Sequence, residues 1–205
     1  LLLGCAGALQ QSASFKVVAA HVHHGLRKES DEEQRIVQSL CDSLGVECVC
    51  KQIQVEPHQG SLAAGARIGR YNALLEIASN LNITQVGTAH HATDQLETML
   101  MAICRGSGLQ KLAGMKASRP LSPQVQLIRP LLHAQKSDLE TICRDCDVNW
   151  CEDPTNQDIS SPRGFLRKKV LPHLRELWPA ADKHAANAST LLQSAIDSFE
   201  KKIPD

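Results

Sequence analysis

The stretch GTAHHATDQLET, residues 87–98, decides the fold of this chain, because a short apolar run ends there in a cluster of histidines and acids. The residues before it, 83–86, are β-prone. After it, apolar residues recur at helical spacing, at Leu96, Met99, Leu100 and Ile103. The cluster is therefore expected where a strand is followed by a helix, and in open α/β sheets this carboxyl end of a strand is where ligands bind.

Two acids of this stretch, Asp94 and Glu97, are three residues apart and so project from one face of the expected helix. One interpretation is structural: Asp94 caps the helix and Glu97 is solvated. The other is functional, because the histidines His90 and His91 directly precede the pair. The stretch alone leaves both interpretations open.

Strands and helices alternate through residue 104, which predicts an α/β fold with a doubly wound parallel sheet and right-handed crossovers. We expect strands at 15–22, 46–55 and 83–86, and helices at 1–11, 30–44, 62–79 and 94–104. A loop is expected at 116–126, an ordered segment at 128–132, and helices at 136–145, 163–177 and 180–199. The expected domains are an α/β catalytic domain at 1–158 and a helical extension at 159–205.

Length, charge and cysteine content narrow the class of protein further. A chain of 205 residues can bury a substantial core, and Lys+Arg and Asp+Glu both number 22, so no global basic field indicates nucleic acid. No apolar run approaches a transmembrane span, and the start of the chain is a poor signal peptide. The eight cysteines are expected to be reduced, because a chain of this size needs no disulfides. These features predict a cytoplasmic protein without a membrane partner.

Two metal sites were weighed and neither is predicted. Cys143 and Cys146 have the spacing of half a zinc or iron–sulfur site, but no second pair stands at metal-ligand spacing. A metallohydrolase would combine the histidines of 21–24 with His90, His91 and Asp94. Those histidines lie on two different loops, and no further carboxylate pattern surrounds the first group.

Basic residues form two local groups. Arg67 and Arg70 share a helix face and are followed by Tyr71. Residues 157–178 carry Arg163, Arg167, Lys168, Lys169 and Arg175 against Asp158 and Glu176. Such a cluster can meet phosphates, although a charged helix face is often only solvated.

Read together, these segments resemble the tRNA(Ile)-lysidine synthetases, members of the ATP-pyrophosphatase group of adenine-nucleotide α-hydrolase-like folds. The matching stretches are HVHHGLRKES (21–30), GARIGRY (65–71), TAHHATDQLETMLM (88–101), RGSGLQKLAGM (105–115), IRPLL (128–132), WCEDPTNQD (150–158) and the segment 163–172. HGLR-x-ES and W-x-EDPTN-x-D are the discriminating motifs, because related thiolating enzymes share the histidine–aspartate stretch and IRPLL.

The resemblance implies an ATP-dependent ligase that joins free lysine to the wobble cytidine of an isoleucine tRNA with a CAU anticodon. It implies catalytic roles for Asp94, Glu97, Arg67 and His90, with the two carboxylates facing the lysine amine. It places Ala20, His21, Val22, Arg67 and His90 at ATP, and Arg163, Arg167 and Lys168 at the tRNA. ATP with Mg²⁺ would be used, no protein metal site is expected, and a homodimer is left open.

The chain departs from the family pattern in two places. The phosphate loop SGG-x-DS is absent from residues 1–205, so we expect an N-terminally truncated domain that binds ATP weakly and has little or no activity. Gly164 stands where the family usually has Asn, which affects the expected contact there. Two alternatives stay open: a tRNA 2-thiocytidine-type thiolating enzyme of the same fold, in which Cys143 and Cys146 would be catalytic or cluster ligands, and a non-catalytic tRNA-binding remnant.

Overall fold

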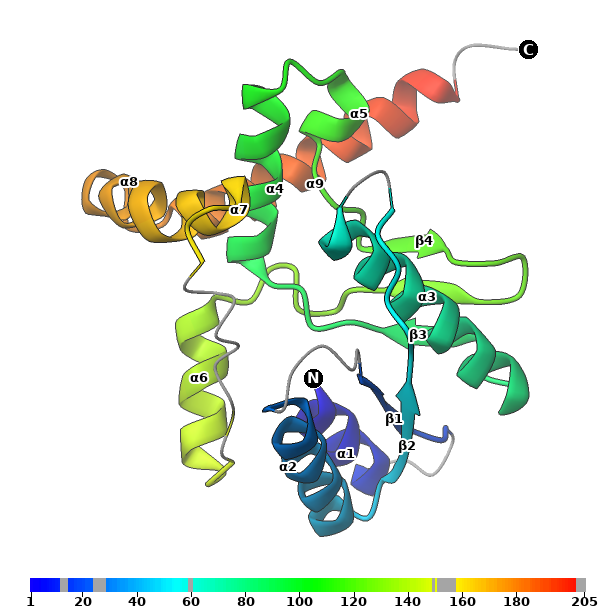
Figure 1. The fold of residues 1–205 in the computed structure, drawn as a ribbon. Helices are drawn as coiled ribbons and strands as arrows, with labels where there is room; N and C mark the ends of the chain where they lie inside the picture. The colour runs from blue at the N-terminus through cyan, green and yellow to red at the C-terminus, as the bar shows by residue number, and fades with distance from the viewer. Residues whose placement is uncertain (12–14, 24–28, 59–60, 149, 151–157, 202–205) are drawn as a thin grey trace. The chain divides into compact units, whose positions relative to one another are not determined.

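The computed structural model of the protein describes residues 1–11, 15–23, 29–58, 61–148, 150 and 158–201. These form two compact units. The first unit comprises residues 1–87, 119–128 and 148–150, and the second comprises 88–118, 129–147 and 151–205. Each unit is described by itself below, and Figure 1 labels their elements.

The first unit begins with one helix, which is followed by a β–α–β arrangement. Helix α1 (Leu2–Gln11) precedes strand β1 (Val18–His23), helix α2 (Glu29–Leu44) and strand β2 (Glu47–Gln52). The two strands are parallel, in a register that pairs Val18 with Glu47 and His23 with Gln52. The parallel pair with a helical crossover confirms the α/β prediction, and the strands are shorter than the expected ranges.

A second parallel pair follows the long helix α3 (Leu62–Asn80), which contacts both β1 and β3. Strands β3 (Gln85–Gly87) and β5 (Gln126–Ile128) pair in parallel, and β4 (Ser118–Pro120) lies on the other side of β5. The loop expected at 116–126 is therefore interrupted by β4 and ends at the first residue of β5, while residues 116–117 and 121–125 are loop as predicted. Both strands have three residues, which is too short for a period-2 pattern to be visible in the sequence.

Small residues let α3 lie close to the chain that leads into it. Ser61 caps the helix by accepting a hydrogen bond from the backbone N–H of Ala64 at 3.2 Å. A Cβ added at Gly65 would lie 1.8 Å from the carbonyl oxygen of Glu56, so only glycine fits at this crossing. Gly65 thus fixes the position of α3, and with it Arg67, against the segment that follows β2.

The second unit is helical. Its elements are α4 (Ala92–Cys104), α5 (Leu109–Leu112), α6 (Lys136–Asp145), α7 (Pro162–Phe165), a π-helical turn η2 (Leu166–Val170), α8 (Leu171–Leu177) and α9 (Ala181–Glu200). Leu96 of α4, Leu171 of α8 and Ala181 and Ala185 of α9 form its buried core. Within the described ranges no strand follows β5, as predicted, and the helices after residue 159 pack on α4. A domain boundary at 158/159 remains a prediction.

A buried amide ties the 105–115 segment to α4 and α9. Gln95 is 2% exposed, and its side chain donates to the carbonyl oxygen of Met115 at 3.1 Å and accepts from the Met115 N–H at 2.8 Å. Its Nε2 also donates to Ser189 Oγ of α9. Gly114 allows this contact, because its φ is +74° and an added Cβ would lie 2.9 Å from the Gln95 amide.

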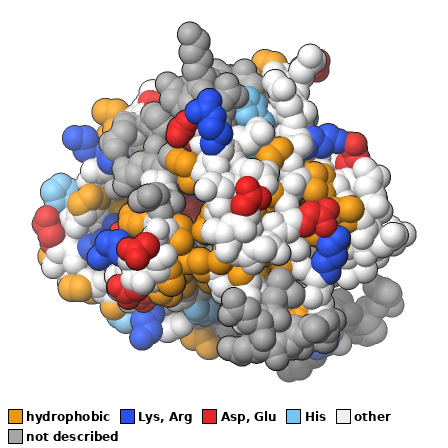
Figure 2. All heavy atoms as spheres, turned by 90° about the horizontal axis from the view of Figure 1, so that it is seen from below, with side chains coloured by type: hydrophobic (Ala, Val, Ile, Leu, Met, Phe, Trp, Pro, Cys, Tyr) orange, Lys and Arg blue, Asp and Glu red, His pale blue; other side chains and the backbone are white. Residues whose placement is uncertain are grey.

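Figure 2 shows basic, acidic and hydrophobic side chains interspersed on one face, without a patch of a single charge. Ion pairs such as Lys16–Glu47 and Arg35–Glu32, each at 2.6 Å, are consistent with the balanced composition. None of the helices in the described ranges is both long and apolar enough to cross a membrane. The seven cysteines that the structure describes are all free.

Candidate functional site

The first turn of α4 places Asp94 against the chain before it. One carboxylate oxygen, Oδ2, accepts a hydrogen bond from the His91 backbone N–H at 3.1 Å and lies 3.5 Å from His91 Nε2. The carboxylate caps the helix, as the structural interpretation predicted. Its side chain is nevertheless 18% exposed, so it can still be reached from solvent.

Glu97 lies one turn further along α4 and is not solvated. Its side chain has no exposed area, and both carboxylate oxygens are held by arginines. Arg163 Nε donates to Oε2 at 2.6 Å, while Arg167 donates from Nε to Oε1 at 2.7 Å and from Nη2 to Oε2 at 3.0 Å. The interpretation of Glu97 as a solvated acid is therefore wrong, because a buried carboxylate requires charged partners of this kind.

Arg163 also links the two acids. Its Nη2 lies 3.7 Å from Asp94 Oδ1 and donates to the Asp94 carbonyl oxygen and to Thr98 Oγ1, each at 3.4 Å. Two carboxylates and two guanidinium groups thus form one charged cluster between α4 and the α7–η2 segment. Glu97 is fully buried against the two arginines, whereas the Asp94 side chain is 18% exposed.

The backbone of α7 and η2 brings both arginines to Glu97. Ser161 caps α7 by accepting from the Gly164 N–H at 3.1 Å, and the helix widens to a π turn at Leu166–Val170. Arg163 and Arg167 face inward with side chains 37% and 32% exposed, whereas Lys168 and Lys169 are exposed on the outside. The four cations therefore divide into an inward arginine pair and an outward lysine pair.

Gly164 is buried where the helix crosses the preceding segment. A Cβ at this position would lie 1.8 Å from the carbonyl oxygen of Asp158. An Asn, the residue that the resemblance led us to expect, has no space here. Glycine at position 164 therefore lets the two backbone segments approach each other at this crossing.

The histidines before α4 have different surroundings. His90 Nδ1 lies 2.9 Å from Thr88 Oγ1. Nδ1 of His91 is buried and has no hydrogen-bond partner in the described part of the chain.

The remaining predicted residues belong to the first unit. Ala20, His21 and Val22 lie on β1, where Ala20 is exposed and the other two are half-buried. Burial, followed by the nearby charge of His23, lowers the pKa of His21, so its ring is neutral at pH 7. The buried Nε2 of His21 has no partner among the described residues.

Arg67 on α3 stands in a group that the sequence did not reveal. Its guanidinium carbon lies 5.1 Å from the centre of the Tyr71 ring, and Nη2 donates to the Tyr71 hydroxyl at 3.4 Å. Arg119 of β4 lies 5.4 Å from the centre of the same ring. The sequence could not predict the role of Arg119, because no local pattern connects residues 71 and 119. Only the folded structure brings Arg119 of β4 to the Tyr71 ring of α3.

The residues considered as metal ligands do not come together in the described structure. Across the ranges that the structure describes, no three His, Cys, Asp or Glu residues form a group that could hold a metal ion. Cys143 is half-buried and Cys146 exposed, both at the end of α6. His24, which belonged to the metallohydrolase alternative, and Cys151 lie outside the described residues.

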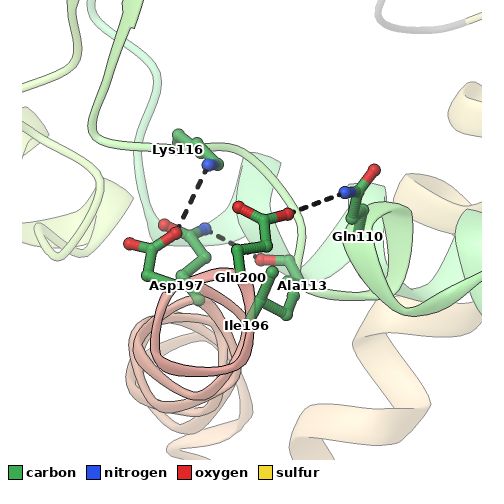
Figure 3. Close-up of a pocket in the computed structure, with 7 residues that line it drawn as sticks. Gln110, Ala113, Lys116, Ile196, Asp197 and Glu200 are labelled. Atoms are coloured by element: carbon green, nitrogen blue, oxygen red, sulfur yellow. Dashed lines mark hydrogen bonds and ion pairs between the residues drawn. The ribbon is translucent and has the colours of Figure 1, made fainter. Parts of the chain in front are cut away.

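A pocket of about 170 Å³ lies between α5 and α9, away from Asp94 and Glu97 (Figure 3). Its polar groups already bind one another. Lys116 Nζ lies 3.7 Å from Asp197, and Gln110 Nε2 donates to Glu200 at 3.0 Å. These contacts join the short helix to α9, and they leave the charged cluster around Glu97 as the candidate site of this unit.

Comparison with known proteins gives matches along most of the chain. A family profile described as the PP-loop domain matches residues 1–174. Proteins named tRNA(Ile)-lysidine synthase are similar in sequence. That of Pseudomonas aeruginosa is 38% identical over 199 residues, covering 96% of this chain and 44% of its own length. That of Histophilus somni strain 2336 is 32% identical over 226 residues, covering 100% and 52%. The chain spans about half the length of the curated relatives it matches.

One solved structure shows the fold. A U34-tRNA thiolase from Methanococcus maripaludis, solved with its [4Fe-4S] cluster, superposes with a TM-score of 0.74 at 14% identity. The match covers 94% of this chain and 68% of the thiolase. The expected parallel α/β fold of the nucleotide α-hydrolase type is therefore confirmed.

Proposed function

Because this chain belongs to the PP-loop domain family, we propose that it is the catalytic part of an ATP-dependent ligase that forms lysidine in isoleucine tRNA. In the first step the C2 oxygen of the wobble cytidine attacks the α-phosphorus of ATP and pyrophosphate leaves. In the second step the ε-amine of free lysine attacks C2, and AMP leaves. The family membership supports the use of ATP, and the names of the relatives support the tRNA substrate.

The observation that carries the proposal is the difference in burial between the two acids, since Asp94 is 18% exposed and Glu97 is fully buried. Free lysine has an amine pKa of about 10.4, so it must lose a proton before it attacks. Glu97 binds two guanidinium groups with both oxygens and is fully buried, so the ammonium of a free lysine cannot reach it. Asp94 is partly exposed and keeps an accessible edge, so we assign it the orientation and deprotonation of lysine. Glu97 then positions Arg163 and Arg167.

ATP is assigned to the residues named from the resemblance. The adenosine would lie against Ala20, His21 and Val22 of β1, where the neutral His21 ring has an unused buried nitrogen. The resemblance also assigns the phosphates to Arg67 of the first unit and to His90 of the second, because a cation stabilises the charge of the leaving pyrophosphate. The described residues provide no cluster that fits Mg²⁺, so no step is assigned to a protein-bound metal.

The tRNA is assigned to the α7–η2 segment. Lys168 is exposed and, like Lys169, forms no ion pair with the described residues, so its ammonium group can contact a phosphate. Arg163 and Arg167 keep about a third of their side chains exposed while they bind Glu97. Phosphate contacts of this kind position the tRNA without reading its sequence. A cytoplasmic location and a homodimer remain predictions.

The test is mass spectrometry of nucleosides from isoleucine tRNA incubated with ATP and isotope-labelled lysine. The 205-residue chain should give little or no product, because SGG-x-DS is not among its residues. The same chain with an added strand and an SGG-x-DS loop, the phosphate loop that the resemblance implies, joined before Leu1 should give labelled lysidine. Asp94→Asn in that protein should abolish the product. If the tRNA incubated with the joined, unsubstituted protein yields only unmodified cytidine at the wobble position, the ligase is refuted.

A thiolating enzyme is the second candidate, favoured by the structural similarity to a tRNA thiolase and by the pair Cys143 and Cys146. It predicts 2-thiocytidine in the same digests when a sulfur donor replaces lysine. Cys143→Ser would then abolish that product. A non-catalytic tRNA-binding remnant predicts neither nucleoside, even with the phosphate-loop segment joined.

A further inference from the structure

Two arginines from distant parts of the first unit meet at a single aromatic ring. Arg67 comes from α3 and Arg119 from β4, and their guanidinium carbons lie 5.1 Å and 5.4 Å from the centre of the Tyr71 ring. Each distance is within the range in which a cation is attracted to the face of a tyrosine. One ring is therefore in contact with two guanidinium groups.

The charges have no opposite partner in the described ranges. No carboxylate forms an ion pair with Arg67 or Arg119 there, whereas Arg35 on α2 of the same unit is paired with Glu32 at 2.6 Å. Both side chains are also held in place: Arg67 donates to the Tyr71 hydroxyl at 3.4 Å, and Arg119 Nη1 donates to the Pro120 carbonyl oxygen at 3.0 Å. Oriented cations without a paired carboxylate are stabilised when an anion binds them.

We propose that Arg119 and Tyr71 join Arg67 in a phosphate-binding site of the first unit. The ligand class is a phosphate or polyphosphate, because guanidinium groups bind phosphate oxygens through paired N–H donors. The Tyr71 hydroxyl supplies one more polar contact. The inference rests on the proposed function, which already assigns Arg67 to nucleotide phosphates, and adds to it two residues that carried no role.

Tyr71 provides a probe, since it is the only tyrosine of the chain. Protein grown with 3-fluorotyrosine carries one ¹⁹F label, located at the proposed site. Titration with inorganic tripolyphosphate should shift this single resonance to saturation. Sodium chloride at the same ionic strength should not, and a chloride shift equal to that of tripolyphosphate would overturn the proposal.

Substitutions assign the contact. Arg119→Gln and Arg67→Gln should each raise the apparent Kd for tripolyphosphate about tenfold, and Arg119→Lys should recover part of the affinity. Arg35→Gln removes the same charge from a paired arginine and should change the Kd less than twofold. An unchanged Kd in Arg119→Gln with an intact amide NMR spectrum would exclude Arg119 from the site. The Lys variant also shows whether Gln has only disturbed the fold.

The source of the phosphate is separated by a second ligand, an RNA stem–loop with a CAU loop. Saturation by tripolyphosphate assigns the site to a nucleotide, whereas saturation by the RNA alone assigns it to the RNA backbone. No shift with either ligand overturns the site. The proposed ligase is judged independently by the nucleoside digests, so a missing lysidine product with a saturating ¹⁹F shift would refute the ligase and keep the phosphate site.

Discussion

Glu97 is the residue whose environment constrains the site most. Its carboxylate is fully buried, and Arg163 and Arg167 supply three hydrogen bonds to it. Removal of one member of a buried ion cluster leaves the others without compensation, which costs about 3–5 kcal/mol. We therefore expect Glu97→Gln to lower the free energy of unfolding by about 3 kcal/mol, measured by urea denaturation.

The matched control is Glu32→Gln on α2. That carboxylate pairs with Arg35 at the surface, with side chains 60% and 74% exposed, so its loss should change stability by less than about 0.5 kcal/mol. Equal losses in the two variants would contradict the argument that burial makes Glu97 structural.

The sequence predicted one half of this arrangement at the residue scale. The spacing of Asp94 and Glu97 placed both on one face of a helix, and both acids do lie on the α7–η2 side of α4, where Arg163 contacts them. Their partners could not be predicted, because Arg163 is 66 residues from Glu97 and no local periodicity connects them. Composition indicated a solvated or phosphate-facing helix here, and the resemblance implied a tRNA-facing one. Neither indicated that the Nε atoms of Arg163 and Arg167 bind a buried carboxylate.

Among the elements, the corner between α8 and α9 depends on one ion pair. Arg175 donates to Asp182 from Nε at 2.8 Å and from Nη2 at 2.9 Å, and Nη2 also donates to Thr93 Oγ1 of α4 at 3.2 Å. Burial alone would raise the pKa of Asp182, but the hydrogen bonds and charge of Arg175 outweigh it, and the pKa lies below its ordinary value. The pair thus joins three helices.

This pair predicts a dependence of stability on pH. A carboxyl with a lowered pKa in the folded state stabilises the fold fully above its unfolded pKa of about 3.9, and this contribution is lost as the pH falls through the folded value. Asp182→Asn should therefore reduce stability by about 1 kcal/mol at pH 7, allowing for the exposed side of Arg175, and by less at pH 3. Urea denaturation at both values measures this, and Asp197→Asn, in an exposed pair, should show no such pH dependence. An equal loss for Asp182→Asn at both pH values would contradict the assignment.

Element prediction succeeded where patterns were long. Helices α2, α3, α4, α6 and α9 lie within a few residues of the expected ranges, because each carries caps or a periodic apolar face over at least ten residues. Strands β4 and β5 and helix α5 have only three or four residues each, and their pairing comes from tertiary contacts. The π turn between α7 and α8 was also not predicted, since its sequence LRKKV is equally compatible with an α-helix.

At the scale of the whole molecule, the strands of the first unit form two separate sheets, with the order β1–β2 in one and β3–β5–β4 in the other. Helix α3 contacts both β1 and β3. In the described ranges, β1 and β3 each have one strand edge without a hydrogen-bonded neighbour. Unpaired edges of this kind can accept another strand, and a parallel strand between them would join the two sheets.

We therefore expect an added strand followed by an SGG-x-DS loop, joined before Leu1, to stabilise the fold. New ladder hydrogen bonds worth a few kcal/mol should raise the melting temperature by about 5–10 °C in a chain of this size. Calorimetry of the 205-residue chain and the joined chain measures the shift. A proline in the middle of the added strand removes a ladder N–H and should cancel most of the gain without changing the phosphate loop. If the proline variant melts at the same temperature as the joined chain, the added strand does not pair with β1 and β3, and the two sheets are complete as they stand.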